Sequence, residues 1–233
     1  PLGLQFSVLA IGIIVMQGAV VRFDIAENGI MVPGTPAQNG FSAANKLINF
    51  LMALYNGLAS AILGFNAQNY GKSDYRRIRQ GTRQSLIIML IMYAFCLTAG
   101  LLLSIGGAYQ HIFMSEDKIS AASVRFGNTY LYVDFILYFI LGFLIVTRSA
   151  VQGITKVGYV LGAGVAELVS RVLICAYLPA LVNGGATDAS ASLASFAAVC
   201  FGDPGAWLLA SLVLLVPTVK YIFRMQYKKE VSG

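Results

Sequence analysis

The stretch Leu86–Gly106, LIIMLIMYAFCLTAGLLLSIG, decides the class of fold because its 21 residues include no charged side chain. A helix of that length extends about 30 Å, which is the thickness of the hydrocarbon core of a bilayer. The run is too long and too continuously apolar for a barrel strand, in which apolar and polar residues alternate over about ten residues. In lipid, a helix also satisfies every backbone N–H and C=O within one segment. The stretch therefore predicts a transmembrane helix.

The whole chain has the composition of a membrane protein. Of its 233 residues, 58% are hydrophobic and 11% are charged, whereas soluble proteins carry about 25% charged residues. A soluble domain this apolar could not cover its own surface with polar groups. We therefore expect an all-α, polytopic membrane protein. Its six predicted spans lie near residues 2–21, 41–65, 86–106, 129–151, 158–182 and 205–222.

The segments between these runs are polar or rich in turn formers. Segment 22–40 contains Asn-Gly and Pro-Gly pairs and is predicted to be a loop. Segment 183–204 is rich in Gly, Ala and Ser and ends in Asp203-Pro204, a pair that we expect to cap the last span. Segment 72–83 places four arginines beside two apolar residues. We expect it to form a short helix, capped by Ser73, that lies on an anionic inner leaflet.

The net charge of +6 is distributed unevenly along the chain. Eleven of the sixteen Lys and Arg lie in segments 66–84 and 148–156 and in the tail from Lys220, which share one side of a six-span arrangement, whereas four lie in the opposite set of ends. By the positive-inside rule, the N-terminal end and the C-terminal tail are expected in the cytoplasm. We expect the protein to be a multi-pass protein of the plasma membrane. No aromatic platform or groove-reading module accompanies the basic residues, so no nucleic-acid partner is expected.

The sequence offers little for catalysis or for metal binding. His111 is the single histidine, and the three cysteines are scattered without Cys-x-x-Cys spacing, so we expect no metal site and no cofactor. No Walker A, Gly-x-Ser-x-Gly or His-Glu-x-x-His motif is present, so we expect no enzyme. The chain begins at Pro1 and its first apolar run at Leu2. We expect no signal peptide, and we expect part of a longer chain to be missing.

Ionisable residues within spans are few, and each is a candidate for function. Asp134 lies in the fourth span, with Tyr130 and Tyr138 one turn away on either side and on the same face. A buried carboxylate can take and release a proton, which is what a proton-coupled transporter requires. Alternatively, Asp134 is a hydrated, inert acid near the outer interface, because it lies only one or two turns inside the predicted boundary.

An acid and a base share one face of the fifth span. Glu167 and Arg171 are four residues apart, a spacing at which they can pair with each other. Pairing would neutralise two charges that are costly in lipid. The pair is interpreted as an orienting contact between helices. The alternatives are a conformational lock, or gate, and a role in contact with a substrate.

Side-chain amides form a second polar group within the spans. Three of them share one stripe of the second span, and a fourth lies in the first span. Amides in membrane helices either bond to neighbouring helices or line a wet cavity, and the sequence leaves both open. The residues are Asn45, Asn49 and Asn56 on the stripe, and Gln17 in the first span.

The segment from Gly64 to Gly81, GFNAQNYGKSDYRRIRQG, resembles the cytoplasmic connection of multidrug and toxic compound extrusion (MATE) transporters, with Gln68, Asn69, Tyr70 and Gly71 at its centre. Further stretches are similar to the second half of that family. They are Pro1–Ser7 with Gln17 (first helix), Arg148–Gly153 with its Gln152-Gly153 turn, Glu167–Arg171 (the Glu-x-x-x-Arg helix) and Gly202–Trp207 (the start of the final helix). Together these matches extend over nearly the whole chain.

The resemblance implies a transporter of twelve helices in two six-helix lobes. A cationic or amphipathic small molecule leaves through the cleft between the lobes as sodium or protons enter, by alternating access. The chain would supply the C-terminal lobe, over residues 1–233, with the N-terminal lobe absent and expected as its partner. The expected cleft residues are Asp134, Gln17, Asn45, Asn49, Asn56, Tyr130 and Tyr138. The alternatives are a non-transporting or degenerate membrane module, and an exporter of a lipid-linked amphipath.

Overall fold

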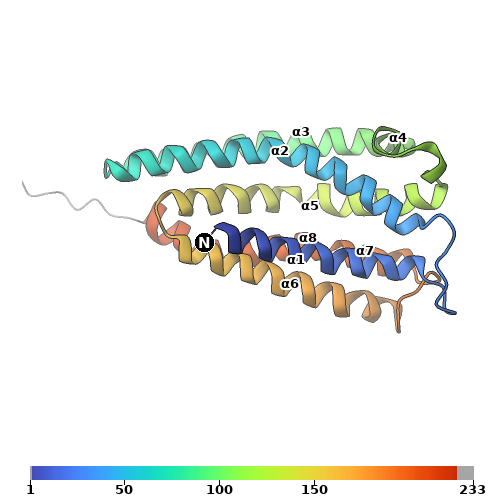
Figure 1. The fold of residues 1–233 in the computed structure, drawn as a ribbon. Helices are drawn as coiled ribbons and strands as arrows, with labels where there is room; N and C mark the ends of the chain where they lie inside the picture. The colour runs from blue at the N-terminus through green and yellow to red at the C-terminus, as the bar shows by residue number, and fades with distance from the viewer. Residues whose placement is uncertain (1, 225–233) are drawn as a thin grey trace, which may run out of the picture.

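The protein is a bundle of long helices packed side by side (Figure 1). The computed structural model describes residues 2–224, and the side chains of residues 10–224. The helices are α1 (Leu2–Val21), α2 (Pro36–Gly71), α3 (Tyr75–Ser104), α4 (Ala108–Phe113), α5 (Ala121–Gly153), α6 (Val157–Asn183), α7 (Leu193–Cys200) and α8 (Gly202–Thr218), and a π-helical turn follows at Val219–Phe223. Residues 2–224 contain no strand beyond one isolated bridge, which confirms the all-α prediction.

The predicted spans correspond to long helices. Five helical segments are long and apolar enough to cross a membrane: Pro36–Gly71, Tyr75–Phe113, Ala121–Gly153, Val157–Asn183 and Leu193–Phe223. The 20-residue helix α1 occupies the position of the first predicted span. Large apolar side chains such as Ile14, Phe95 and Leu102 are exposed on the outside of the bundle, as lipid-facing side chains are. The chain is therefore a multi-pass membrane protein.

Helix α5 lies between two groups of helices. On one side it packs against α2 and α3, and on the other against α7 and α8, beside which α6 and α1 are arranged (Figure 1). Its side chains Phe135 and Tyr138 are fully buried. The Tyr138 hydroxyl donates to the Ile48 carbonyl of α2 at 3.1 Å, and its ring centroid lies 5.2 Å from that of Tyr55. These contacts make α5 the centre of the core.

The start of α2 is set by a buried acid and a close contact. The carboxylate of Asp24 accepts hydrogen bonds from the backbone N–H groups of Ala37 (2.9 Å) and Gln38 (2.8 Å), so it caps the helix. A Cβ atom at Gly40 would collide with the carbonyl of Ser123, so only glycine lets α2 approach α5 there. The helix therefore begins at residue 36, five residues before the predicted span.

The prediction of a short interfacial helix at 72–83 is wrong. Asp74, rather than Ser73, caps the helix by accepting from the N–H of Arg77 at 3.0 Å. The helix then continues without interruption to Ser104, because nothing between the arginines and the apolar run stops a helix. The basic residues are thus the first turns of the spanning helix α3.

The prediction for segment 183–204 is also wrong in part. Ser192 accepts from the N–H of Ser195 at 3.1 Å and starts α7 inside the segment that was expected to be a loop. The run from Leu193 to Cys200 is apolar, although its small residues resemble a linker in composition. Asp203 is consequently not a cap at the membrane surface. It lies in the first turn of α8, ten residues beyond Leu193.

Candidate functional site

A cavity of about 320 Å³ lies between the two groups of helices. Side chains from α1, α2, α5, α6 and α8 line it, so it reaches the interior of the bundle rather than one surface. Its apolar walls include Met16, Phe41 and Trp207. Its polar lining consists of Asn45, Asn49, Asn56, Tyr130, Asp134, Arg148, Glu167, Arg171 and Asp203. Most of the residues expected in a cleft therefore lie in one cavity.

A network of ion pairs crosses this cavity. Arg148 on α5 bonds to the Glu167 carboxylate on α6 at 2.6 Å. Arg171 contacts the other oxygen of Glu167 at 3.7 Å and the Asp203 carboxylate on α8 at 2.6 Å. The Glu167 and Arg171 side chains are each only 5% exposed, so these charges depend on one another for stability. The predicted Glu167–Arg171 pair exists, but Glu167 has a shorter bond to Arg148, and Arg171 has a shorter bond to Asp203.

Tyr130 completes the partners of Asp203. Its hydroxyl donates to the second carboxylate oxygen of Asp203 at 2.7 Å, while Arg171 holds the first. The Tyr130 ring is stacked on Phe41, with centroids 4.6 Å apart, which fixes the direction of the hydroxyl. Both oxygens of Asp203 are therefore satisfied.

Asp134 is the contrasting carboxylate. It is fully buried, and neither of its oxygens has a hydrogen-bond partner among the described residues. The helix begins at Ala121, not near residue 129, so Asp134 is the fourteenth of 33 residues and lies near the middle of α5. The interpretation as a hydrated acid near the interface is thus wrong. An ionised carboxylate without a partner is costly in such a place.

The asparagine stripe of α2 forms one wall of the cavity. The Asn49 amide donates to the side-chain oxygen of Asn45 at 2.9 Å and to its carbonyl at 2.8 Å, so these bonds stay within α2. Asn56 lines the same wall two turns further along. Of the two interpretations of the stripe, the lining of a cavity agrees with this geometry.

Two expected cleft residues lie elsewhere. Gln17 is exposed and is not among the residues that line the cavity, whereas its neighbour Met16 is. Tyr138 is one turn beyond Asp134 but is turned toward α2, where its hydroxyl bonds to a backbone carbonyl. Its function in the fold is packing.

The predicted cytoplasmic connection lies away from the cavity, at the end of α2. Gln68 and Gly71 are exposed, and the Tyr70 ring packs against Tyr75 with centroids 6.2 Å apart. Asn69 is buried. Its side-chain amide donates to the Phe65 carbonyl at 2.7 Å, and its backbone carbonyl accepts from the N–H of Asp74 at 2.9 Å. These bonds shape the turn into α3.

The Gln152-Gly153 turn is held against α2 by close packing. The Gln152 carbonyl accepts from the N–H of Thr155 at 3.0 Å as α5 ends. A Cβ atom at Gly153 would lie 2.8 Å from the Cβ of Asn66, closer than side chains approach. Asn66, which the sequence did not single out, donates to Ala150 of α5 at 3.3 Å. The end of α2, which leads into α3, is thus held against the end of α5, which leads into α6.

Arg148 and Asp203 are the functional candidates that the sequence analysis missed. One was counted with a basic loop and the other as a helix cap, yet both belong to the ion-pair network. For Arg148, the sequence did contain an indication: Ser-Ala-Val follows it, so the helix can continue past Arg148 and keep it within the bundle. Gly12 of α1 is a further missed residue, because a Cβ atom there would lie 2.6 Å from the guanidinium of Arg171.

Long apolar helices around a cavity with buried charges define a polytopic membrane protein with a polar interior, an arrangement that transporters use. The MatE family model matches residues 31–177, which is more than half of the chain. The chain therefore belongs to the MATE family of membrane transporters, as the motifs indicated. The match extends from the loop before α2 into α6 and includes Asp134, Arg148, Glu167 and Arg171. No curated protein and no solved structure matches the chain.

Proposed function

We propose that this chain is one six-helix lobe of a secondary active transporter, which exports cationic or amphipathic small molecules across the plasma membrane in exchange for sodium or protons. The observation that carries the proposal is the unpartnered, fully buried carboxylate of Asp134 in the wall of the cavity. A second six-helix lobe would close the other side of the cleft, and rocking of the two lobes would expose the cleft to each side of the membrane in turn.

The balance of charges supports a cation as the ligand. The cavity holds two arginines, Arg148 and Arg171, against three carboxylates, Glu167, Asp203 and Asp134. Both arginines are engaged by the first two acids, so neither is free to receive an anion. One negative charge then remains at Asp134 when it is ionised. A proton, a sodium ion or the positive group of a substrate can each balance it, and their competition provides coupling.

The walls of the cavity suit an amphipathic molecule. Phe41 and Trp207 offer aromatic surface to an apolar or cationic group. The asparagine stripe on α2 adds amides to the lining of the same space. A volume of about 320 Å³ is at the lower end of the range for small-molecule sites, roughly 300–1,000 Å³, which is consistent with a lobe that supplies part of a larger cleft.

The test is accumulation of a cationic dye in cells that express the protein as its gene encodes it. We expect less dye than in vector controls, and we expect Asp134→Asn to restore accumulation because the exchangeable charge is lost. Asp117→Asn, an exposed acid at the end of the bundle, is the matched control and is expected to export normally. Equal accumulation in vector and wild-type cells across several dyes, with the protein in the membrane, would instead support a non-transporting module.

A further inference from the structure

Two lysines converge on one tyrosine where α6 begins and α8 ends. The Nζ atoms of Lys156 and Lys220 lie 4.9 Å and 5.2 Å from the centre of the Tyr221 ring. The Tyr159 ring adjoins them, with its centroid 6.0 Å from that of Tyr221. These four residues, the lysine–tyrosine cluster, lie at one end of the spanning helices and are not among the residues that line the cavity with Asp134.

The backbone brings these side chains together. Lys156 is the residue that precedes α6, and Tyr159 follows in the first turn. Lys220 and Tyr221 belong to the π-helical turn Val219–Phe223, whose wider geometry turns them toward α6. Such turns are rare and often mark functional sites. The turn is also tied to α3, because Arg79 donates its Nε to the Ile222 carbonyl at 3.4 Å and so brings a third cation to this end.

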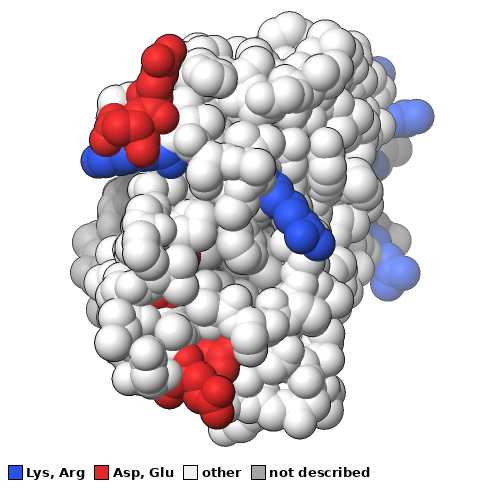
Figure 2. All heavy atoms as spheres, turned by 90° about the vertical axis from the view of Figure 1, so that its right-hand side faces the viewer, with Lys and Arg blue, Asp and Glu red and all other residues white. Residues whose placement is uncertain are grey.

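Among residues 2–224, no acid forms a salt bridge with either lysine of the cluster. The three salt bridges in the described part of the chain all lie in the cavity. Asp74, the acid of the connection between α2 and α3, is engaged as a helix cap. At the opposite end of the bundle, acidic and basic side chains are both exposed (Figure 2). Two ammonium groups at one ring repel each other unless an anion lies between them.

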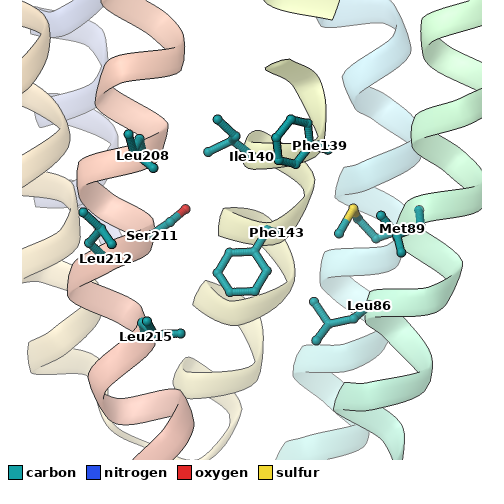
Figure 3. Close-up of a pocket in the computed structure, with 10 residues that line it drawn as sticks. Leu86, Met89, Phe139, Ile140, Phe143, Leu208, Ser211, Leu212 and Leu215 are labelled. Carbon is teal, nitrogen blue, oxygen red and sulfur yellow. The ribbon is translucent and has the colours of Figure 1, made fainter. Parts of the chain in front are cut away.

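An apolar groove lies along α8, the helix that leads into the turn with Lys220 and Tyr221, and along α3, the helix that carries Arg79. It has a volume of about 430 Å³, and its lining side chains come from α3, α5 and α8, where they face a common space (Figure 3). Ser211 is the single polar residue of the lining. The groove extends along α8 to Leu215, five residues before Lys220. On α3 it reaches Leu86, seven residues after Arg79.

We propose that an anionic phospholipid binds here, with its phosphate at the lysine–tyrosine cluster and an acyl chain in the groove. Tyrosine rings prefer the headgroup level of a bilayer, and basic pockets between spanning helices bind anionic headgroups. The first N–H groups of α6 add positive potential, because Lys156 provides no side-chain cap for them. The charge of the cluster selects the headgroup, and the groove selects a lipid over a soluble phosphate.

The experiment measures thermal unfolding of the purified protein in detergent during titration with lipids. Long-chain phosphatidylglycerol should raise the melting temperature, whereas phosphatidylcholine, inorganic phosphate and glycerol phosphate at equal concentration should not. In Lys156→Gln/Lys220→Gln, the apparent affinity for phosphatidylglycerol should fall roughly fivefold per lysine removed. Lys156→Arg/Lys220→Arg, which keeps both charges, should respond as the wild type does.

The control removes the same charge from the opposite end. Lys118→Gln/Arg125→Gln, at two exposed positions, should keep the full response to phosphatidylglycerol. The proposal is overturned if the two glutamine pairs respond alike, or if free phosphate shifts the melting temperature as much as the lipid. A glutamine variant that melts far below the wild type without lipid is replaced by the single substitution Lys220→Gln, for which a retained full affinity also overturns the proposal.

Discussion

The hydroxyl of Tyr130 donates to the carboxylate of Asp203 at 2.7 Å, although 73 residues separate the two along the chain. The bond joins α5 to the first turn of α8 at mid-bundle. It also explains why two carboxylates of the same cavity differ. Asp203 has Tyr130 and Arg171 as partners, whereas Asp134, one turn from Tyr130, has no hydrogen-bond partner among the described residues.

Tyr130→Phe tests this bond. The stacked ring on Phe41 is retained, but one oxygen of Asp203 is left buried without a donor, so the free energy of unfolding should fall by about 1–3 kcal/mol. Chemical unfolding in detergent, followed by tryptophan fluorescence from Trp207, measures the change. Tyr177→Phe at a 70% exposed position is the control. Equal stability of the two variants would mean that the Tyr130 hydroxyl contributes nothing.

Removal of one partner from the ion-pair network should cost more than removal of two. Arg171→Met leaves Asp203 and Glu167 with fewer compensating charges, and breaking a buried pair typically costs about 3–5 kcal/mol. Arg171→Met/Asp203→Asn removes a positive and a negative charge together, so part of the loss should be recovered. A double-mutant cycle on unfolding free energies measures the coupling, and strictly additive losses would contradict it.

Two glycines of α1 should respond oppositely to the same substitution. A Cβ atom at Gly12 would meet the guanidinium of Arg171 at 2.6 Å, so Gly12→Ala should lower the melting temperature. Nothing lies within 4 Å of a Cβ atom at Gly18, so Gly18→Ala should stabilise the helix by roughly 0.5–1 kcal/mol. Thermal unfolding of both variants decides the matter, and a stabilised Gly12→Ala protein would show that α1 is not in close contact with Arg171.

The cap of α2 should also be measurable. Asp24→Ala removes two hydrogen bonds to backbone N–H groups at the start of the helix, so it should cost about 1–2 kcal/mol. Hydrogen exchange should then rise at Ala37 and Gln38 before it rises elsewhere in α2. Asp117→Ala, at an exposed acid of the same end, should leave exchange in α2 unchanged.

The bundle could be predicted from apolar runs because a long apolar segment in lipid must satisfy its own backbone hydrogen bonds, which a helix does. The extent of each helix could not be predicted in this way. Polar residues such as the arginines of α3 belong to the helix but lie outside the apolar run by which it was recognised. Helix α7 was not predicted because its residues resemble those of a loop. Its small residues, from Leu193 to Cys200, have the composition of a linker, and only packing against α6 and α5 distinguishes them.

The candidate site was predictable where it depended on one helix and not where it depended on several. Asn45, Asn49 and Asn56 share a stripe by spacing alone, and that stripe lines the cavity. Gln17 belongs to a helix that is apolar all round, so its sequence carries no signal of which face turns inward. Arg148 and Asp203 acquire partners only when α5, α6 and α8 come together, which is tertiary information.

The contact between Gly12 and Arg171 has a consequence for movement within the bundle. Helix α1 covers this part of the ion-pair network, because Gly12 lies against the buried guanidinium of Arg171. If α1 drew away from α6, that guanidinium would lose its cover and its surroundings would change, at a cost in solvation free energy. The two helices are therefore expected to move together as one rigid body.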